Sequence, residues 1–89
     1  MRSRELKLAE SLKWTPNHDG GIVYNTRIKR ATRLSIKEAI VWELICRFSH
    51  DRTVLEIMQA TFKLNSDDAR NLLFEYLSKW QELGLVEQS

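Results

Sequence analysis

The sequence predicts an α+β domain, in which a three-stranded antiparallel sheet is followed by three helices. Two observations carry this prediction. Between about residues 12 and 34, short apolar and β-branched stretches alternate with turn-forming clusters, as in a small antiparallel sheet. After residue 34, apolar residues recur at three- and four-residue steps, which is the helical period. The helical part could form a helix-turn-helix, so a winged-helix-like arrangement is the leading expectation.

The three predicted strands are defined by the turns between them. Residues 12–15 alternate apolar and polar side chains, and the cluster from 16 to 21 is rich in turn formers. Residues 22–24 are β-branched and aromatic, which suits a strand. Residues 25–27 can turn, so that residues 28–34 form a third, polar strand.

Each predicted helix has a recognisable start. Two starts fit the capping box, in which a hydroxyl and a carboxylate three residues apart cap each other's backbone amides: Ser35 with Glu38, and Thr53 with Glu56. The third helix is expected to start at residue 65 or 66, because Asn and Ser both cap helices well. The predicted helices span about residues 36–48, 54–63 and 67–83.

The apolar residues of the helices predict the core. The first helix is apolar on most sides and is therefore expected to be buried. Trp42 and Trp80 are expected in the core, whereas Trp14 either packs on the helices or lies at a surface that docks a partner. Gly84 suits the end of the third helix, and Leu85 can fold back onto its last turn. One face of the third helix gathers the apolar residues Ala69, Leu72, Leu73, Tyr76, Leu77, Trp80 and Leu83.

Length and composition limit the class of protein. The 89 residues suit one domain spanning residues 1–89, with the first ten or so residues a candidate for disorder. The longest uninterrupted apolar run, residues 39–42, is far shorter than the roughly 20 residues that cross a bilayer. The N-terminus lacks the apolar region of a secretory signal. We therefore expect a cytoplasmic protein.

No pattern of catalytic or metal-binding residues is present. His18 and His50 each stand beside an aspartate in a predicted turn, where solvated side chains are expected rather than a base or a ligand. Cys46 is the only cysteine, so an internal disulfide or multi-thiolate metal site is excluded. It falls in the helix expected to be buried, where burial would raise the pKa of its thiol and hide it. We expect neither an enzyme nor a cofactor.

The charges are unevenly distributed along a chain with a net charge of +2. Arg27, Lys29, Arg30 and Arg33 fall close together with no acid among them, whereas the C-terminal third is acidic. Such a basic strip suggests an acidic partner, either a nucleic acid or an acidic peptide. The alternative is a solvated strand edge whose charges only discourage aggregation.

Three stretches of the sequence resemble the PqqD-like family. They are residues 33–45, residues 52–57 (Arg-Thr-Val-Leu-Glu-Ile) and residues 69–85, which end in Gly-Leu. The resemblance covers about residues 20–86, and none of its motifs is catalytic. Two departures are clear: Ser35 stands where the family usually has Asn, and Ser-His-Asp at 49–51 replaces the common Asp-Gly, so that turn must form without glycine.

The resemblance implies a function and a site. Members of the family bind the leader of a ribosomally synthesised precursor peptide and present the peptide to a modifying enzyme. The leader adds as a fourth strand to the edge of the third strand and lies against the last helix. The implied peptide-binding residues are Ile28, Lys29, Arg30, Ala31, Thr32 and Arg33 on the strand, and Arg70, Leu73, Phe74, Leu77 and Gln81 on the helix.

The residues themselves agree with this mechanism. A polar strand without proline keeps its amides free to pair with an extended peptide. Strand alternation places Ile28, Arg30, Thr32 and Leu34 on one face, expected to be the inner one, and leaves Lys29 and Arg33 for carboxylates of the leader. Phe74 lies off the main apolar stripe, either as satellite core or as the floor of a groove.

Two other functions compete with peptide binding. A winged helix could bind DNA, but the third helix carries Arg70 and Lys79 against four acids, which disfavours duplex recognition. The free strand edge could instead pair with a second copy to form a homodimer. As a free-standing domain, the chain is expected to act as a peptide chaperone beside a separate modifying enzyme or leader peptidase, with no membrane involved.

Overall fold

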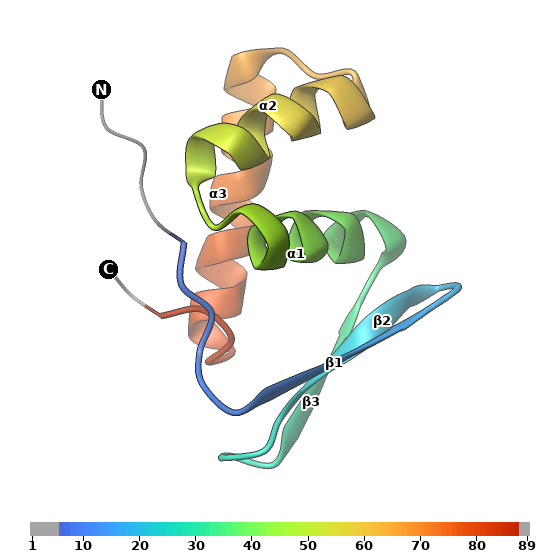
Figure 1. The fold of residues 1–89 in the computed structure, drawn as a ribbon, viewed down its shortest axis with the longest axis vertical. Coiled ribbons are helices and arrows are strands. Elements are labelled where there is room, and N and C mark those ends of the chain that lie inside the picture. Colours follow the sequence, from blue (N-terminus) through green and yellow to red (C-terminus); the bar gives the residue numbers. More distant parts are fainter. Residues whose placement is uncertain (1–5, 88–89) are drawn as a thin grey trace.

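The computed structural model describes residues 6–87, which form a sheet with three helices on one of its faces (Figure 1). The strands precede the helices, as predicted, so the fold class is confirmed. In Figure 1, α1 lies next to the sheet, α2 lies beyond α1, and α3 runs behind both. The elements are β1 (Leu12–Asn17), β2 (Gly20–Asn25), β3 (Arg30–Leu34), α1 (Ile36–Phe48), α2 (Asp51–Phe62) and α3 (Ser66–Glu82).

The sheet has the order β1-β2-β3 with antiparallel pairing, so β1 and β3 are its edges. Val23 and Leu34 are fully buried on the face that the helices cover. The opposite face carries two cross-strand rows of side chains, because residues in register share a face. One row is Lys13, Tyr24 and Ala31, and the other is Thr15, Ile22 and Arg33.

The third strand is shorter than the sequence predicts. Residues 26–29 form the turn between β2 and β3, so the assignment of Ile28 and Lys29 to the strand is wrong. The cause is Asn25, whose side-chain Oδ1 accepts the amides of Arg27 at 3.0 Å and Ile28 at 3.3 Å. Those amides turn the chain and cannot join the ladder. Ile28 is 52% exposed instead of packing inward.

The helix ends follow the predicted caps in two cases out of three. The Ser35–Glu38 capping box begins α1, and the Asn65 side chain accepts the amide of Asp68 to begin α3. The box predicted for Thr53 is wrong, since α2 already begins at Asp51, after His50, which makes no side-chain cap bond. Thr53 therefore lies inside the first turn of α2. At the other end of α3, Gly84 adopts a φ of 76° and the Leu85 amide donates to the carbonyl of Trp80.

The core centres on Trp42 and Trp80, as predicted. Their rings meet edge to face, with centroids 5.2 Å apart, and Tyr76 stacks on Trp80 at 5.5 Å. Helix α1 is buried on one side only, which corrects the expectation of burial all round: Ile36 is 58% exposed. Cys46 is exposed as well, so its predicted burial is wrong. The sheet, α2 and α3 cover the Trp42 side of α1, and Cys46 lies at the margin of that side, beside Trp14 and Pro16.

Residues 6–10 also have a defined place. Leu6 is buried, and the segment pairs with the chain beyond α3 through the Ala9 amide and the Leu85 carbonyl, and through the Glu87 amide and the Lys7 carbonyl. Residues 6–10 therefore have backbone and core contacts, while residues 1–5, on which the rest of the expected disorder falls, lie outside the described part of the chain. Within residues 6–87, no helix has the length and apolar character needed to cross a membrane.

Candidate peptide-binding surfaces

The outer edge of β3 is open to a further strand. Arg30–Leu34 pairs with β2 on one side only. Backbone hydrogen bonds outside the regular elements join turns, caps and the terminal segments, and in the described chain none of them involves residues 30–34. An edge of this kind presents main-chain donors and acceptors that an extended peptide can satisfy.

The side chains of β3 alternate as the sequence predicts from residue 31 onward. Thr32 and Leu34 lie on the helix side, with Leu34 fully buried, and Ala31 and Arg33 are exposed on the other face. Arg30 is exposed although its position in the alternation is inward. The strand therefore offers a buried anchor at one end and cations on its surface, with no acid anywhere between residues 20 and 37.

The predicted residues of the last helix gather around a separate pocket of about 190 Å³. Phe74 lies at its rim and is 72% exposed, so it is not part of the core. Gln81 does not line it. Sequence reasoning missed three of the lining residues, because only packing brings the N-terminal segment and α2 to this place. The lining is Leu6, Asp51, Leu55, Arg70, Leu73, Phe74 and Leu77.

This pocket and the β3 edge lie on different sides of α3. Lys79 follows Arg70 by about two and a half helical turns and so points in the opposite direction. It is Lys79 that reaches Glu38, in the first turn of α1, where its Nζ lies 2.9 Å from Oε2. Glu38 is bonded to Ser35, the residue directly after β3. The end of β3 therefore faces the Lys79 side of α3, whereas no strand residue lines the Phe74 pocket.

The Glu38 side chain is fixed by hydrogen bonds between the end of β3, α1 and α3. Its carboxylate is nearly buried and accepts bonds from the Lys79 ammonium and the Ser35 amide, at 2.9 and 3.1 Å. Burial raises the pKa of the Glu38 carboxyl, but the bonds from Lys79 and Ser35 outweigh it and leave the pKa below its ordinary value. Nearby, burial together with the charges of Glu38 and Glu75 raises the pKa of Tyr76. Because Glu38 and Lys79 lie far apart in sequence, no local pattern could have paired them.

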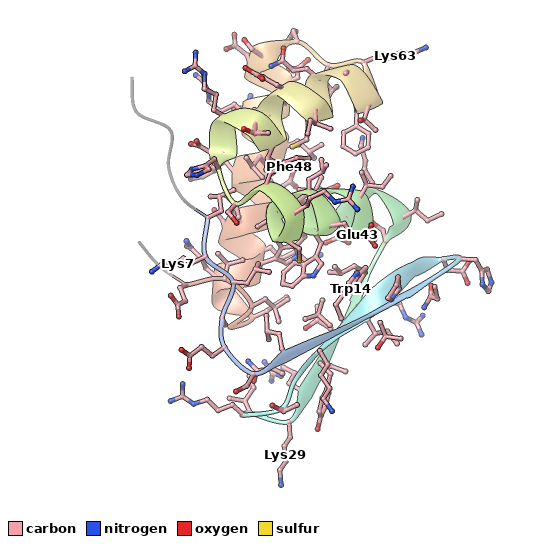
Figure 2. The ribbon with its side chains drawn as sticks, in the orientation of Figure 1. Lys7, Trp14, Lys29, Glu43, Phe48 and Lys63 are labelled. Atoms are coloured by element: carbon pink, nitrogen blue, oxygen red, sulfur yellow. The ribbon has the colours of Figure 1, made fainter. Side chains whose placement is uncertain are left out.

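A third surface lies between β1 and α1. The Trp14 indole donates to Oε1 of Glu43 at 3.2 Å, and its ring centroid lies 6.4 Å from that of Trp42, so Trp14 packs on α1. Figure 2 shows Trp14 and Glu43 facing each other across this junction. Cys46 lines a shallow hollow of about 410 Å³ beside them, with Pro16 and Arg47. Burial and the charge of Glu43 raise the pKa of the Cys46 thiol.

The two histidine–aspartate pairs do not form a centre. Nε2 of His18 lies 3.4 Å from Oδ2 of Asp19 at the tip of the β1–β2 hairpin, where both side chains are almost fully exposed. Within the described residues, no three side chains of His, Cys, Asp or Glu come together in a way that could hold a metal ion.

Comparisons with known proteins add no identification. No protein-family model, curated protein or solved structure matches this chain. The fold and the open strand together define the chain as a small α+β domain with an unpaired sheet edge and a basic strand. What the chain does is therefore inferred from its own surfaces.

Proposed function

We propose that this chain is a non-enzymatic peptide-binding domain that captures an extended segment of a partner as a fourth strand beside β3. The observation that carries the proposal is the outer edge of Arg30–Leu34, which has no backbone partner in the described part of the chain. Main-chain hydrogen bonds supply affinity in this mode of recognition, and alternate side chains supply selectivity.

The strand is well supported for this task. Leu34 is fully buried, and the capping box of Ser35 and Glu38 ties the residue that follows it to α1. At the other end, Asn25 bonds to the turn through its Oδ1 and to the carbonyl of Gly84 through its Nδ2 at 3.3 Å. An edge held at both ends loses little conformational freedom when a peptide adds to it, which favours binding.

The resemblance to the PqqD-like family suggests the identity of the guest. We take it to be the leader of a ribosomally synthesised precursor peptide, which the domain presents in the cytoplasm to a separate modifying enzyme or leader peptidase. Arg70, Leu73, Phe74 and Leu77 stay in the proposal as contacts for residues that follow the added strand. Since their pocket lies on the opposite side of α3, a leader that reaches both must extend past the sheet.

DNA binding is the weaker alternative. A recognition helix needs several free cations, but Lys79 is bound to Glu38 and Arg70 lies beside the Phe74 pocket. The same helix carries Asp67, Asp68, Glu75 and Glu82. With so few cations, α3 would neutralise too few phosphates for strong duplex binding.

The test is a titration of the purified domain with the leader of a precursor peptide encoded beside it, followed by backbone-amide NMR. Saturable shifts and slowed amide exchange are expected at residues 30–34. The sharper test uses leader peptides that are N-methylated at every second residue. Because alternate amides of an added strand face the edge, one parity should abolish binding and the other should preserve it.

Any of three results would reject strand addition of a leader. Equal effects of both N-methylated parities would mean that no ladder forms. Absence of binding to the leader, together with salt-sensitive binding to duplex DNA, would favour the winged-helix alternative. Concentration-dependent shifts at residues 30–34 without any peptide would show that the edge pairs with a second copy instead.

A further inference from the structure

The face of the sheet that the helices leave uncovered adjoins the outer edge of β3. Its two rows end at the edge in Ala31 and Arg33, which are both exposed. Behind Ala31 stands Tyr24, which is 37% exposed, and behind Arg33 stands Ile22. In Figures 1 and 2, the helices lie on the opposite face of the sheet. Lys29, in the turn between β2 and β3, points away from the helices.

A strand added to β3 would continue these rows. Two guest residues separated by one position would point to the same face, one beside Ala31 and the other beside Arg33. The methyl group of Ala31 leaves room for a large guest side chain to lie over it and touch the ring of Tyr24. The position beside Arg33 is different, because it meets a guanidinium with several donors.

Neither ion pair described within residues 6–87, Lys79 with Glu38 and His18 with Asp19, involves Arg33. No acid occurs between residues 20 and 37 to compete for it. A carboxylate matches the planar donor fork of arginine, and a charge-assisted hydrogen bond of this kind is stronger than a neutral one.

This inference rests on the proposed function. We propose that the segment bound at β3 is an acidic peptide in which an apolar and an acidic residue stand at a defined spacing. It carries an aromatic or large aliphatic residue beside Ala31 and an Asp or Glu beside Arg33, with one residue between them. The direction of the guest strand decides which of the two comes first. The intervening side chain points toward the helices.

Other occupants fit this face less well. A second copy of β3 would pair two strands that each carry Arg30 and Arg33 and no acid, and like charges on neighbouring strands repel. A nucleic acid would find only Lys13 and Arg33 as cations in the two rows, too few to hold a phosphate backbone firmly. An acidic peptide matches both the open edge and the charge.

The test is a selection from a displayed library of random 12-residue peptides, followed by affinity measurements on synthetic versions. The selected sequences should be enriched in the spacing of a large apolar residue, any residue and an acid. Changing that acid to its amide should weaken binding by about tenfold, the size expected for one charged hydrogen-bonded pair. Replacing the apolar residue with Ala should weaken binding by a similar factor.

Charge reversal gives the specific readout. Arg33→Glu should weaken binding of the acidic peptide and favour a version with Lys in place of the acid. Lys13→Glu is the matched control, because Lys13 lies on the same face but on β1, two strands away from β3. It should change affinity by less than about twofold at moderate salt. Both positions are exposed, and retention of the β3 amide signals verifies that each variant is folded.

The outcomes separate this inference from the proposed function. Peptides that bind with alternate-amide dependence but without any preference for an acid would overturn the acidic pattern and leave strand addition standing. If no peptide binds in a way that depends on alternate amides, both the acidic pattern and strand addition are overturned. Binding of single-stranded RNA that is equally sensitive to Arg33→Glu, without peptide selection, would show that the face serves a nucleic acid and would also reject the inference.

Discussion

Lys79 donates to the Oε2 atom of Glu38 at 2.9 Å, while the Oε1 atom of the same carboxylate accepts the amide of Ser35. One buried side chain thus connects α3 to the first turn of α1 and to Ser35, the residue directly after the sheet. The connection keeps the end of β3 in a fixed position relative to the helices, which is what a docking strand needs.

Glu38→Gln should reduce stability in a pH-dependent way. The pKa of Glu38 is lowered in the folded state, so its contribution is fully present above the ordinary value near 4.5 and is lost as the pH falls through the folded-state pKa. Urea unfolding of both proteins between pH 7 and pH 3 should show a constant difference above about pH 5 that shrinks below about pH 4.5. Parallel curves throughout this range would contradict the assignment.

Gly20→Ala should be much more damaging than Gly84→Ala. Both glycines have positive φ, 125° and 76°, so both substitutions impose backbone strain. At Gly84 the nearest atom to an added Cβ is 3.7 Å away, and the expected cost is about 1 kcal/mol. At Gly20 the Cβ would lie 2.1 Å from the carbonyl oxygen of Leu34, a backbone atom that cannot move aside. Similar denaturation midpoints for the two variants would refute this account.

Trp80→Ala should unfold most of the protein, whereas Phe74→Ala should leave its stability nearly unchanged. Trp80 is fully buried against Trp42 and Tyr76, and truncation of a core tryptophan costs about 3–5 kcal/mol. A domain of this size has little stability to lose. Phe74 is 72% exposed and serves as the control of similar chemistry. Near-UV circular dichroism and thermal melts measure both, and a large destabilisation by Phe74→Ala would place that ring in the core.

Cys46 should react with iodoacetamide in the folded protein, but more slowly than a free cysteine at the same pH. Its side chain is exposed, yet burial of part of the thiol and the charge of Glu43 raise the pKa, so less thiolate is present. Glu43→Gln should accelerate the reaction, whereas Glu56→Gln, on α2, should not. Mass spectrometry over time gives the rates. A thiol that reacts only after denaturation would rule out this placement.

Much of the fold could be predicted from the sequence because its signals are local. The capping box of Ser35 and Glu38 and the cap at Asn65 each depend on residues three positions apart. Gly84 ends α3 through the backbone of the same turn. The strand order β1-β2-β3 was also predictable, because short turns join consecutive β-branched stretches. The second capping box failed because Thr53 had the right spacing but His50 and Asp51 already began the helix.

The candidate site was less predictable because long-range packing decides it. The sequence by itself determined that a basic, proline-free third strand would precede the helices, and that Arg70, Phe74, Leu77 and Gln81 would share one flank of α3. Only the tertiary structure decided how α3 is rotated about its axis. By burying Trp80 and pairing Lys79 with Glu38, packing turns the Phe74 flank toward Leu6 and α2 and away from the end of β3. Periodicity defines the faces of a helix, but contacts between residues distant in sequence determine what each face meets.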